Sequence, residues 1–218
     1  MNKVYNYYNS KEIIDNMLDP EYFGKNLWHT PLLFKSQNEN DFLIENSGIK
    51  NGDNILDFGC GLGGFLDIVT NKYKCNAIGV NISPKQLEIA RKNLSNKKIE
   101  FIYFWNMISL PNNSIDIVFA QESIVHYDDK KELFNYFYNM LKPKGILIFQ
   151  DWFLYNKELA VKTDEIYKTF LKPLDLYKDL INKIGFKKYR VYQPENTDII
   201  NNNKKELGFT NYIIKCEK

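Results

Sequence analysis

The stretch Leu56-Asp57-Phe58-Gly59-Cys60-Gly61-Leu62-Gly63-Gly64 carries the strongest fold signal in this sequence. A short apolar run that contains Asp57 is followed directly by a segment in which four of six residues are glycine, Gly59 to Gly64. The pattern predicts a buried strand over Asn54–Phe58, a tight turn, and a helix over about Gly63–Tyr73. Because glycines carry no Cβ atom, backbone in such a turn can approach a ligand closely.

Strand-like and helix-like segments alternate after this turn, in the manner of βαβ units of a parallel sheet. One helix begins after Ser83, where Pro84 and Gln86 stand at the spacing of a capping box with proline in the first position. Asp128 or Asp129 caps another helix, which reaches Met140-Leu141 before Pro143 and Gly145 end it. The further strands are predicted at Asn76–Val80, Ile99–Phe104, Ile115–Ala120 and Ile146–Gln150.

The tail of the chain has a different pattern. A helix is predicted over Leu174–Ile184, ended by Gly185, and strands over Phe186–Tyr192 and Phe209–Lys215. The polar stretch Gln193–Glu206 between the strands shows no helical period. A loop connection makes these strands an antiparallel pair, because a parallel crossover usually needs a helix. The fold class expected is therefore α/β: a Rossmann-like, doubly wound sheet of seven strands, mostly parallel, with an antiparallel C-terminal strand.

The N-terminal part is expected to be helical. Ser10 can cap a helix that runs to Leu18, and Asp41–Asn46 reads as a helix that Gly48 ends. The length suits one domain over 1–218, with an N-terminal helical cap at 1–48 and the Rossmann-like core at 49–218.

The composition of the chain indicates which kinds of partner the protein can bind. The 218 residues are 44% hydrophobic, enough for one core, and the formal net charge of +2 gives no bulk attraction to nucleic acid or anionic membrane. A small-molecule partner is the default. The three cysteines are widely spaced and lack a zinc or disulfide pattern, so no metal site is expected. With no apolar run long enough to span a bilayer and a polar N-terminus, we expect a cytoplasmic protein.

The glycine bend also satisfies the G-x-G-x-x-G pattern of dinucleotide enzymes. A dinucleotide site needs an acid at the end of the second strand, where this chain has Asn81. Asp57 would repel a pyrophosphate but attract an ammonium group. A purely structural turn is the other alternative. The agreement of strand, loop, helix and acidic residue favours a ligand-binding loop.

The segment from Leu56 to Gly64 resembles motif I of class I S-adenosylmethionine-dependent methyltransferases, in which this loop holds the methionyl part of the cofactor. The resemblance implies that the cofactor contacts Asp57, Gly59, Cys60 and Gly61. It implies a small-molecule acceptor, because the chain is similar to the sarcosine/dimethylglycine, tocopherol, sterol and cyclopropane-fatty-acid methyltransferase groups.

Two further segments extend the resemblance. Val80-Asn81-Ile82-Ser83-Pro84-Lys85-Gln86 is similar to groups in which an amide replaces the usual ribose-binding acid, which implies cofactor contacts by Asn81, Ile82 and Gln86. Gln86 has a second interpretation, in which it merely completes the capping box with Ser83. Asn106 and Met107 precede Leu110-Pro111, where the family usually has Asp-Ala. They would meet the adenine, in a departure from the family pattern.

The segment Gln121-Glu122-Ser123-Ile124-Val125-His126 follows the strand over Ile115–Ala120, and ligands of open α/β sheets bind at the carboxyl ends of strands. The amine, tocopherol and sterol branches carry a similar arrangement. Gln121 would border the cofactor. Glu122 would accept a hydrogen bond from the acceptor, take its proton or stabilise a developing cation. His126 either relays a proton near neutral pH or caps or packs against the following helix.

Three more residues are candidates on the resemblance. Asp151 follows the strand over Ile146–Gln150 and either faces the acceptor or caps the next helix. Tyr8 lies in a tyrosine-rich segment similar to one that closes over the cofactor. His29 is similar to a histidine that edges the pocket.

The leading hypothesis is an enzyme that transfers a methyl group from S-adenosylmethionine to a small molecule, an amine or an isoprenoid-like carbon. Aromatic residues make up 15% of the chain and suit either acceptor, since their faces attract cations. A catalytically inactive S-adenosylmethionine-binding protein and a nicotinamide-dependent oxidoreductase are the alternatives. Nucleic-acid methylation is disfavoured because no Asn-Pro-Pro-Tyr-type clamp follows the strand over Ile115–Ala120.

Overall fold

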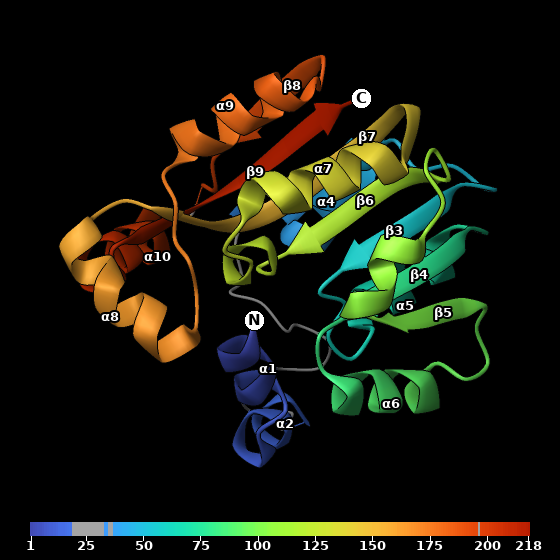
Figure 1. Cartoon of the computed structure of the whole chain (residues 1–218), viewed down its shortest axis with the longest axis horizontal. Coiled ribbons are helices and arrows are strands. Elements are labelled where there is room, and N and C mark those ends of the chain that lie inside the picture. Colours follow the sequence, from blue (N-terminus) through green and yellow to red (C-terminus); the bar gives the residue numbers. More distant parts are fainter. Residues whose placement is uncertain (19–32, 35–36, 196) are drawn as a thin grey trace.

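The computed structural model describes residues 1–18, 33–34, 37–195 and 197–218. Within these residues one large sheet has the strand order β5-β4-β3-β6-β7-β9-β8 (Figure 1). Strand β9 runs antiparallel to both of its neighbours, and the other pairings are parallel. The predicted mixed sheet is confirmed. Its strands are β3 Asn54–Phe58, β4 Asn76–Asn81, β5 Ile99–Tyr103, β6 Ile115–Gln121, β7 Leu141–Leu154, β8 Lys188–Tyr192 and β9 Phe209–Glu217.

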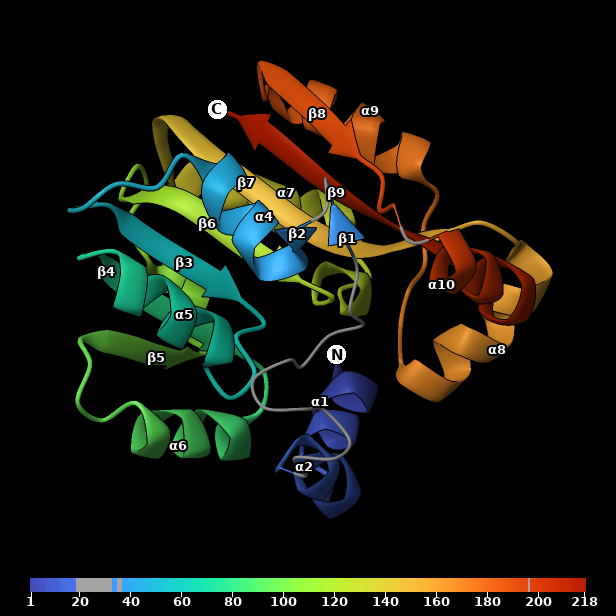
Figure 2. The same ribbon diagram turned by 180° about the vertical axis from the view of Figure 1, so that it is seen from behind.

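Helices cover both faces of this sheet, as the doubly wound prediction required (Figures 1 and 2). Along β6, Val118 and Ala120 belong to one buried cluster and Ile117 and Phe119 to the other, because successive side chains point to opposite faces. One cluster packs under α7 (Lys130–Met140) and α9 (Leu174–Ile184). The other packs under α4 (Glu39–Ser47), α5 (Gly64–Lys72) and α6 (Pro84–Asn93).

The helix ends follow the local signals in the sequence. The Ser83 hydroxyl accepts a hydrogen bond from the Gln86 backbone N–H at 3.2 Å and so caps α6. Asp129, one of the two predicted caps, accepts from the Glu132 backbone N–H at 2.9 Å at the start of α7. Gly185 ends α9 with φ of +111°, a conformation that costs glycine little.

The N-terminal helices α1 (Asn2–Tyr8) and α2 (Lys11–Leu18) lie beyond the carboxyl ends of the central strands (Figure 1). Helix α2 matches the sequence prediction, whereas α1 was not predicted. Helix α8 (Lys157–Tyr167), which follows β7, was also missed. Two short strands, β1 (Leu33–Phe34) and β2 (Gln37–Asn38), pair antiparallel before α4.

Two tail predictions need correction. The stretch 193–206 was expected to lack helix, but it contains α10 (Thr197–Asn202) and the start of a π-helix over Asn203–Leu207. Ile200, only 3% exposed, packs into the core beside Ile199, so tertiary burial overrides the polar composition. Strand β7 also extends on both sides of the predicted Ile146–Gln150. Leu141 pairs with Ile115 of β6 at one end, and β9 pairs with β7 as far as Leu154 at the other.

In the part of the chain that the structure describes, the helices lack the length and apolar character needed to cross a bilayer.

Candidate functional site

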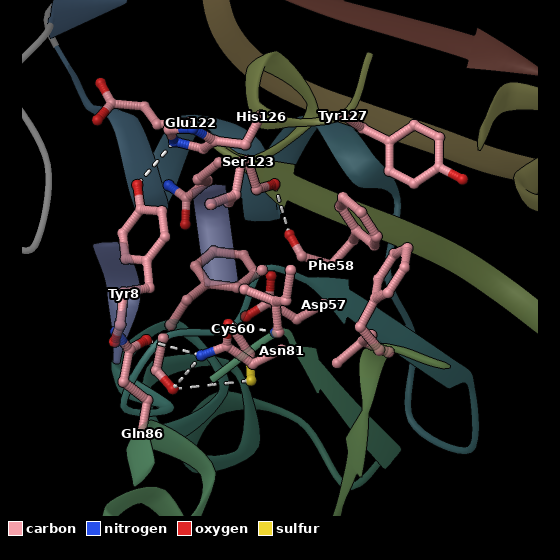
Figure 3. A pocket seen from close by; sticks show the side chains of 18 of the residues that line it. Tyr8, Asp57, Phe58, Cys60, Asn81, Gln86, Glu122, Ser123, His126 and Tyr127 are labelled. Atoms are coloured by element: carbon pink, nitrogen blue, oxygen red, sulfur yellow. Dashed lines mark hydrogen bonds between the residues drawn. The ribbon is translucent and has the colours of Figure 1, made fainter. Parts of the chain in front are cut away.

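A cavity opens at the carboxyl ends of β3, β4 and β6, with α1 and α2 contributing to its wall (Figure 3). This is the end of a parallel sheet where ligands of open α/β folds bind. The structure brings together there most of the residues predicted from the sequence: Tyr8, Asp57, Gly59, Cys60, Gly61, Asn81, Ile82, Gln86, Gln121, Glu122 and His126.

Sequence reasoning missed several other residues that line the cavity. Val4 comes from α1, Met1 precedes that helix, and Met17 comes from α2; the remainder are Phe58, Gly64, Phe65, Val80, Phe104, Ser123 and Tyr127. Their side chains are mainly apolar or aromatic. An apolar wall with a few polar groups at defined places is typical of a small-molecule site.

Gly59 is where the glycine bend meets the loop after β6. Its φ is +81°, and a Cβ atom added there would lie 2.3 Å from the Ser123 Cβ. The Ser123 hydroxyl donates a 2.6 Å hydrogen bond to the Phe58 carbonyl and holds the two loops together. Only glycine fits this position, because a side chain would force the loops apart.

Gly61 faces the cavity. Among the residues that the structure describes, a Cβ atom added there would have only the Met17 side chain, at 3.7 Å, within contact distance. Behind the bend, Asp57 is 3% exposed and contributes a carboxylate to the lining. The bend thus offers a backbone cradle with a negative charge beside it, which suits a ligand that carries an ammonium group.

The amides of Asn81 and Gln86 connect the bend to the N-terminal helix. Asn81 Nδ2 donates to the Gly61 carbonyl at 3.2 Å and to Gln86 Oε1 at 2.7 Å. Gln86 Nε2 donates to the Tyr8 carbonyl at 3.1 Å. The Gln86 backbone N–H thus bonds the Ser83 cap, whereas its side chain holds α1. Contact of these amides with a ribose stays a prediction.

Two further hydrogen bonds fix α1 to the start of α6. The Ser83 hydroxyl donates to Asn9 Oδ1 at 2.9 Å, and Lys85 Nζ donates to the Asn9 carbonyl at 3.0 Å. Together with the Gln86 contact, these bonds place α1 over the cavity, so Tyr8 comes within reach of the loop after β6.

Tyr8 and His126 form the one hydrogen bond that crosses the cavity from α1 to that loop (Figure 3) among the described residues. The Tyr8 hydroxyl lies 2.7 Å from His126 Nε2, while Nδ1 lies 3.2 Å from the Lys168 carbonyl. A carbonyl only accepts, so Nδ1 carries the proton, and Nε2 accepts from the Tyr8 hydroxyl. His126 does not cap the following helix, whose cap is Asp129.

Burial sets the protonation states of this pair. It lowers the pKa of His126 to about 4, against the opposing influence of the Lys168 hydrogen bond, so the imidazole is neutral at pH 7. Burial also raises the pKa of Tyr8, and the charge of Glu122 adds to that rise. The phenol therefore keeps its proton and remains a donor.

Glu122 occupies a strained position at the end of β6. Its φ is +47°, uncommon for a residue with a side chain, and its backbone N–H donates to the Gln150 carbonyl at 3.0 Å. Such strain is concentrated at functional sites. The neighbouring Gln121 side chain donates to Glu39 Oε1 at 2.9 Å and to Asn40 Oδ1 at 2.8 Å, and so anchors the start of α4.

Three predicted site residues lie outside the cavity lining. Asn106 is exposed, and Met107 is buried in the core; both are in the 3₁₀ helix Phe104–Ser109. Asp151 is fully buried, and it does not cap the next helix, whose cap is Asn156. The roles predicted for them in binding or catalysis stay predictions. His29 falls outside the described residues.

The comparisons with known proteins agree with this geometry. Residues 56–149 match the family described as "Methyltransferase domain". The family resemblance inferred from the sequence is thereby confirmed, and the matched segment runs from the glycine bend to the end of the apolar part of β7.

Proteins similar to this chain include enzymes whose names state a small-molecule substrate. The chain is 31% identical over 160 residues to phosphoethanolamine N-methyltransferase 2 of Caenorhabditis elegans, covering 68% of this chain and 36% of that protein. It is 26% identical over 149 residues to phosphoethanolamine N-methyltransferase 1 of Arabidopsis thaliana, covering 66% and 30%. The chain thus spans about a third of these relatives.

Among solved structures, Haemonchus contortus phosphoethanolamine N-methyltransferase 2 in complex with S-adenosyl-L-methionine gives a TM-score of 0.80 at 18% identity. The likeness covers 99% of this chain and 60% of that one. Geranyl diphosphate C-methyltransferase from Streptomyces coelicolor also gives 0.80, at 14% identity, and covers 99% and 96%. At such identities the likeness establishes the fold.

Gly59→Ala is expected to destabilise the protein more than Gly52→Ala. Both glycines have positive φ, but among the described residues only the Cβ added at Gly59 meets a close neighbour. The left-handed conformation alone costs roughly 1–2 kcal/mol, and the clash with Ser123 adds at least about 1 kcal/mol more. Urea unfolding measures the difference. Equal losses in the two variants would contradict the close approach.

The low pKa of His126 predicts a pH dependence of stability. The unfolded histidine titrates near 6.5 and the folded one near 4, so the stabilising difference is present above 6.5 and is lost as the pH falls toward 4. His126→Gln, which cannot titrate, should lose less unfolding free energy between pH 7 and pH 4.5 than the wild type. Urea unfolding at both pH values tests this, and identical losses would refute the assignment.

Proposed function

We propose that this protein is an S-adenosylmethionine-dependent methyltransferase that acts on a small-molecule amine. One observation carries the proposal: the cradle of Gly59 and Gly61, with the Asp57 carboxylate beside it, shares one cavity with Glu122, His126 and Tyr8. A cofactor loop and a set of proton-handling side chains thus face the same space. The match of residues 56–149 to a methyltransferase domain supports the same conclusion.

The residues present suit the cofactor. Asp57 supplies a negative charge for the ammonium of its amino-acid end, and the open side of Gly61 leaves room for that end to lie against the backbone. Aromatic and apolar side chains, among them Phe58, Phe104 and Tyr127, line the same cavity, and aromatic faces attract sulfonium cations. S-adenosylmethionine supplies an electrophilic methyl group on a sulfonium sulfur.

The second half of the cavity suits an amine acceptor. Methyl transfer needs a free electron pair on the nitrogen, so a protonated amine must first lose a proton. The Tyr8 hydroxyl can take that proton on its oxygen while its own proton passes to His126 Nε2, which the neutral imidazole offers as an acceptor. The Glu122 carboxylate lines the same space and would stabilise a cationic nitrogen.

An isoprenoid-like carbon acceptor is the second candidate, and the aromatic lining is the observation in its favour, since aromatic faces also stabilise carbocations. An amine remains better supported, because Tyr8 and His126 form a route for a proton that the acceptor must lose before it is methylated.

We further propose a cytoplasmic protein whose partner is a small molecule and not nucleic acid. The net charge of +2 gives no bulk attraction to polyanions. All three cysteines are free thiols, and Cys60 and Cys216 are buried, which suits a reducing compartment.

Calorimetry tests the cofactor. We expect S-adenosylmethionine to bind with micromolar affinity, and Asp57→Ala to weaken binding at least about tenfold, because a charge-assisted hydrogen bond is lost. Nicotinamide dinucleotides serve as the control ligand. Absence of heat with S-adenosylmethionine and the intact protein would remove the proposal, and binding of a nicotinamide cofactor instead would favour the oxidoreductase.

Glu122→Gln is expected to reduce turnover more than it reduces cofactor affinity, because Glu122 lines the cavity with Tyr8 and His126 and lies outside the glycine bend. Transfer of labelled methyl from S-adenosylmethionine to a panel of small amines, with geranyl diphosphate as a comparison acceptor, measures turnover. The matched control is Glu88→Gln, an exposed acid on α6. Equal turnover of Glu122→Gln and wild type would exclude a catalytic role, and cofactor binding without transfer to any acceptor would favour an inactive binding protein.

A further inference from the structure

The loop after β6 carries Glu122 and His126 but has little regular structure of its own. Among its residues only Ile124–His126 form a short 3₁₀ helix. Backbone groups outside a regular ladder need other partners when they are buried, and Ile124 and Val125 are both fully buried. The side chains that satisfy these groups therefore determine where the loop lies.

Lys130 satisfies the carbonyl groups of this loop. It is the first residue of α7 and only 3% exposed, which is rare for a lysine. Its ammonium donates to the carbonyls of Ile124 at 2.7 Å, Val125 at 3.1 Å and Tyr127. An ammonium has three N–H donors, so all of them are used on one turn of the loop.

Asp151 holds the same loop from the side of the sheet. Its side chain is fully buried on β7, where Oδ2 accepts from the Val125 backbone N–H at 2.9 Å and Oδ1 accepts from the Trp152 N–H at 2.8 Å. Both carboxylate oxygens are thus engaged with backbone, and Asp151 is not among the residues that line the cavity. This geometry suits a supporting role better than contact with the acceptor.

The two charged groups meet at one residue. Val125 gives its N–H to Asp151 and its carbonyl to Lys130, so an anion and a cation hold the same residue through its two backbone polar groups. Burial lowers the pKa of Lys130 and raises that of Asp151, and each charge opposes the shift of the other. Each buried charge is therefore compensated by the presence of its partner.

We propose that Lys130 and Asp151 are a pair of positioning residues that fix the loop after β6 through Val125, and so hold His126 Nε2 against the Tyr8 hydroxyl. Neither residue touches the acceptor in this assignment. The kinetic part of the inference rests on the proposed methyl transfer, whereas the structural part, the orientation of His126, does not.

Kinetics of three variants test the pair: Lys130→Met, Asp151→Asn and the double variant. Each single variant should lower kcat about 10- to 100-fold, since a small misplacement of a catalytic group has a large effect on rate. The affinity for S-adenosylmethionine should stay within about threefold of wild type, because β3 and β4 build the cofactor bend. Lys131→Met, an exposed neighbour on α7, is the control and should leave kcat unchanged.

The double variant distinguishes the loss of loop positioning from the effect of leaving one buried charge without its partner. It contains no unpaired buried charge, so it should fold more stably than Lys130→Met, and it keeps the proposal testable if that variant does not fold. Its kcat should remain low, because the three N–H donors of Lys130 are still missing. Recovery of wild-type kcat in the double variant would overturn the proposal, as would a parallel loss of kcat and cofactor affinity in the single variants.

The ring nitrogens of His126 give a readout that needs no activity. In ¹⁵N NMR spectra at pH 7 the wild type should show the neutral tautomer with the proton on Nδ1, with His126→Asn identifying the signals. Asp151→Asn and the double variant should show a mixture of tautomers, and unchanged spectra would overturn the inference. A wild type that binds no S-adenosylmethionine would remove the proposed function alone, and these spectra would still decide the positioning role.

Discussion

The contact between Gly59 and Ser123 is the constraint on which the site depends. The turn after β3 and the loop after β6 come from neighbouring parallel strands, so they emerge side by side at one edge of the sheet. They can touch only because Gly59 has no side chain, and the Ser123 hydroxyl then bonds the Phe58 carbonyl at 2.6 Å. The loop that would hold the cofactor and the loop that would handle the acceptor are thereby joined in one rigid unit.

The remaining parts of the site are positioned relative to that unit by buried polar side chains. On one side, Asn81 and Gln86 connect the glycine bend to the Tyr8 backbone. On the other, Lys130 and Asp151 support the loop that ends in His126. The hydrogen bond from Tyr8 to His126 connects these two sides across the cavity. In this account the N-terminal helix belongs to the site, because it supplies one of the two partners in that bond.

Local signals in the sequence predicted those parts of the fold that local physics decides. The strand Asn54–Phe58 and the cap at Ser83 are examples, since a short apolar run, glycine and proline each act within a few residues. Helix α10 could not be predicted in this way, because its formation depends on the burial of Ile200 against distant residues. The register of β9 against the far half of β7 is also a tertiary property, which is why β7 is longer than its apolar run suggests.

The same distinction applies to the site. Because ligands bind at the carboxyl ends of parallel strands, the sequence alone predicts that Asp57, Asn81 and Glu122 lie near one another, and all three line the cavity. Lys130 carried no such signal, because a lysine beside a helix cap reads as a solvated residue, and only the loop backbone reveals what it binds. Ser123 was missed for a similar reason, since its partner is a carbonyl on another strand.

A crystal structure of the protein with S-adenosylhomocysteine would show where the cofactor binds. We predict that the amino-acid end of the ligand lies against Gly59 and Gly61 with its ammonium near Asp57, and that its sulfur points toward the space between Tyr8 and Glu122. A ligand bound outside this cavity, or one whose ribose occupies the glycine bend, would contradict it.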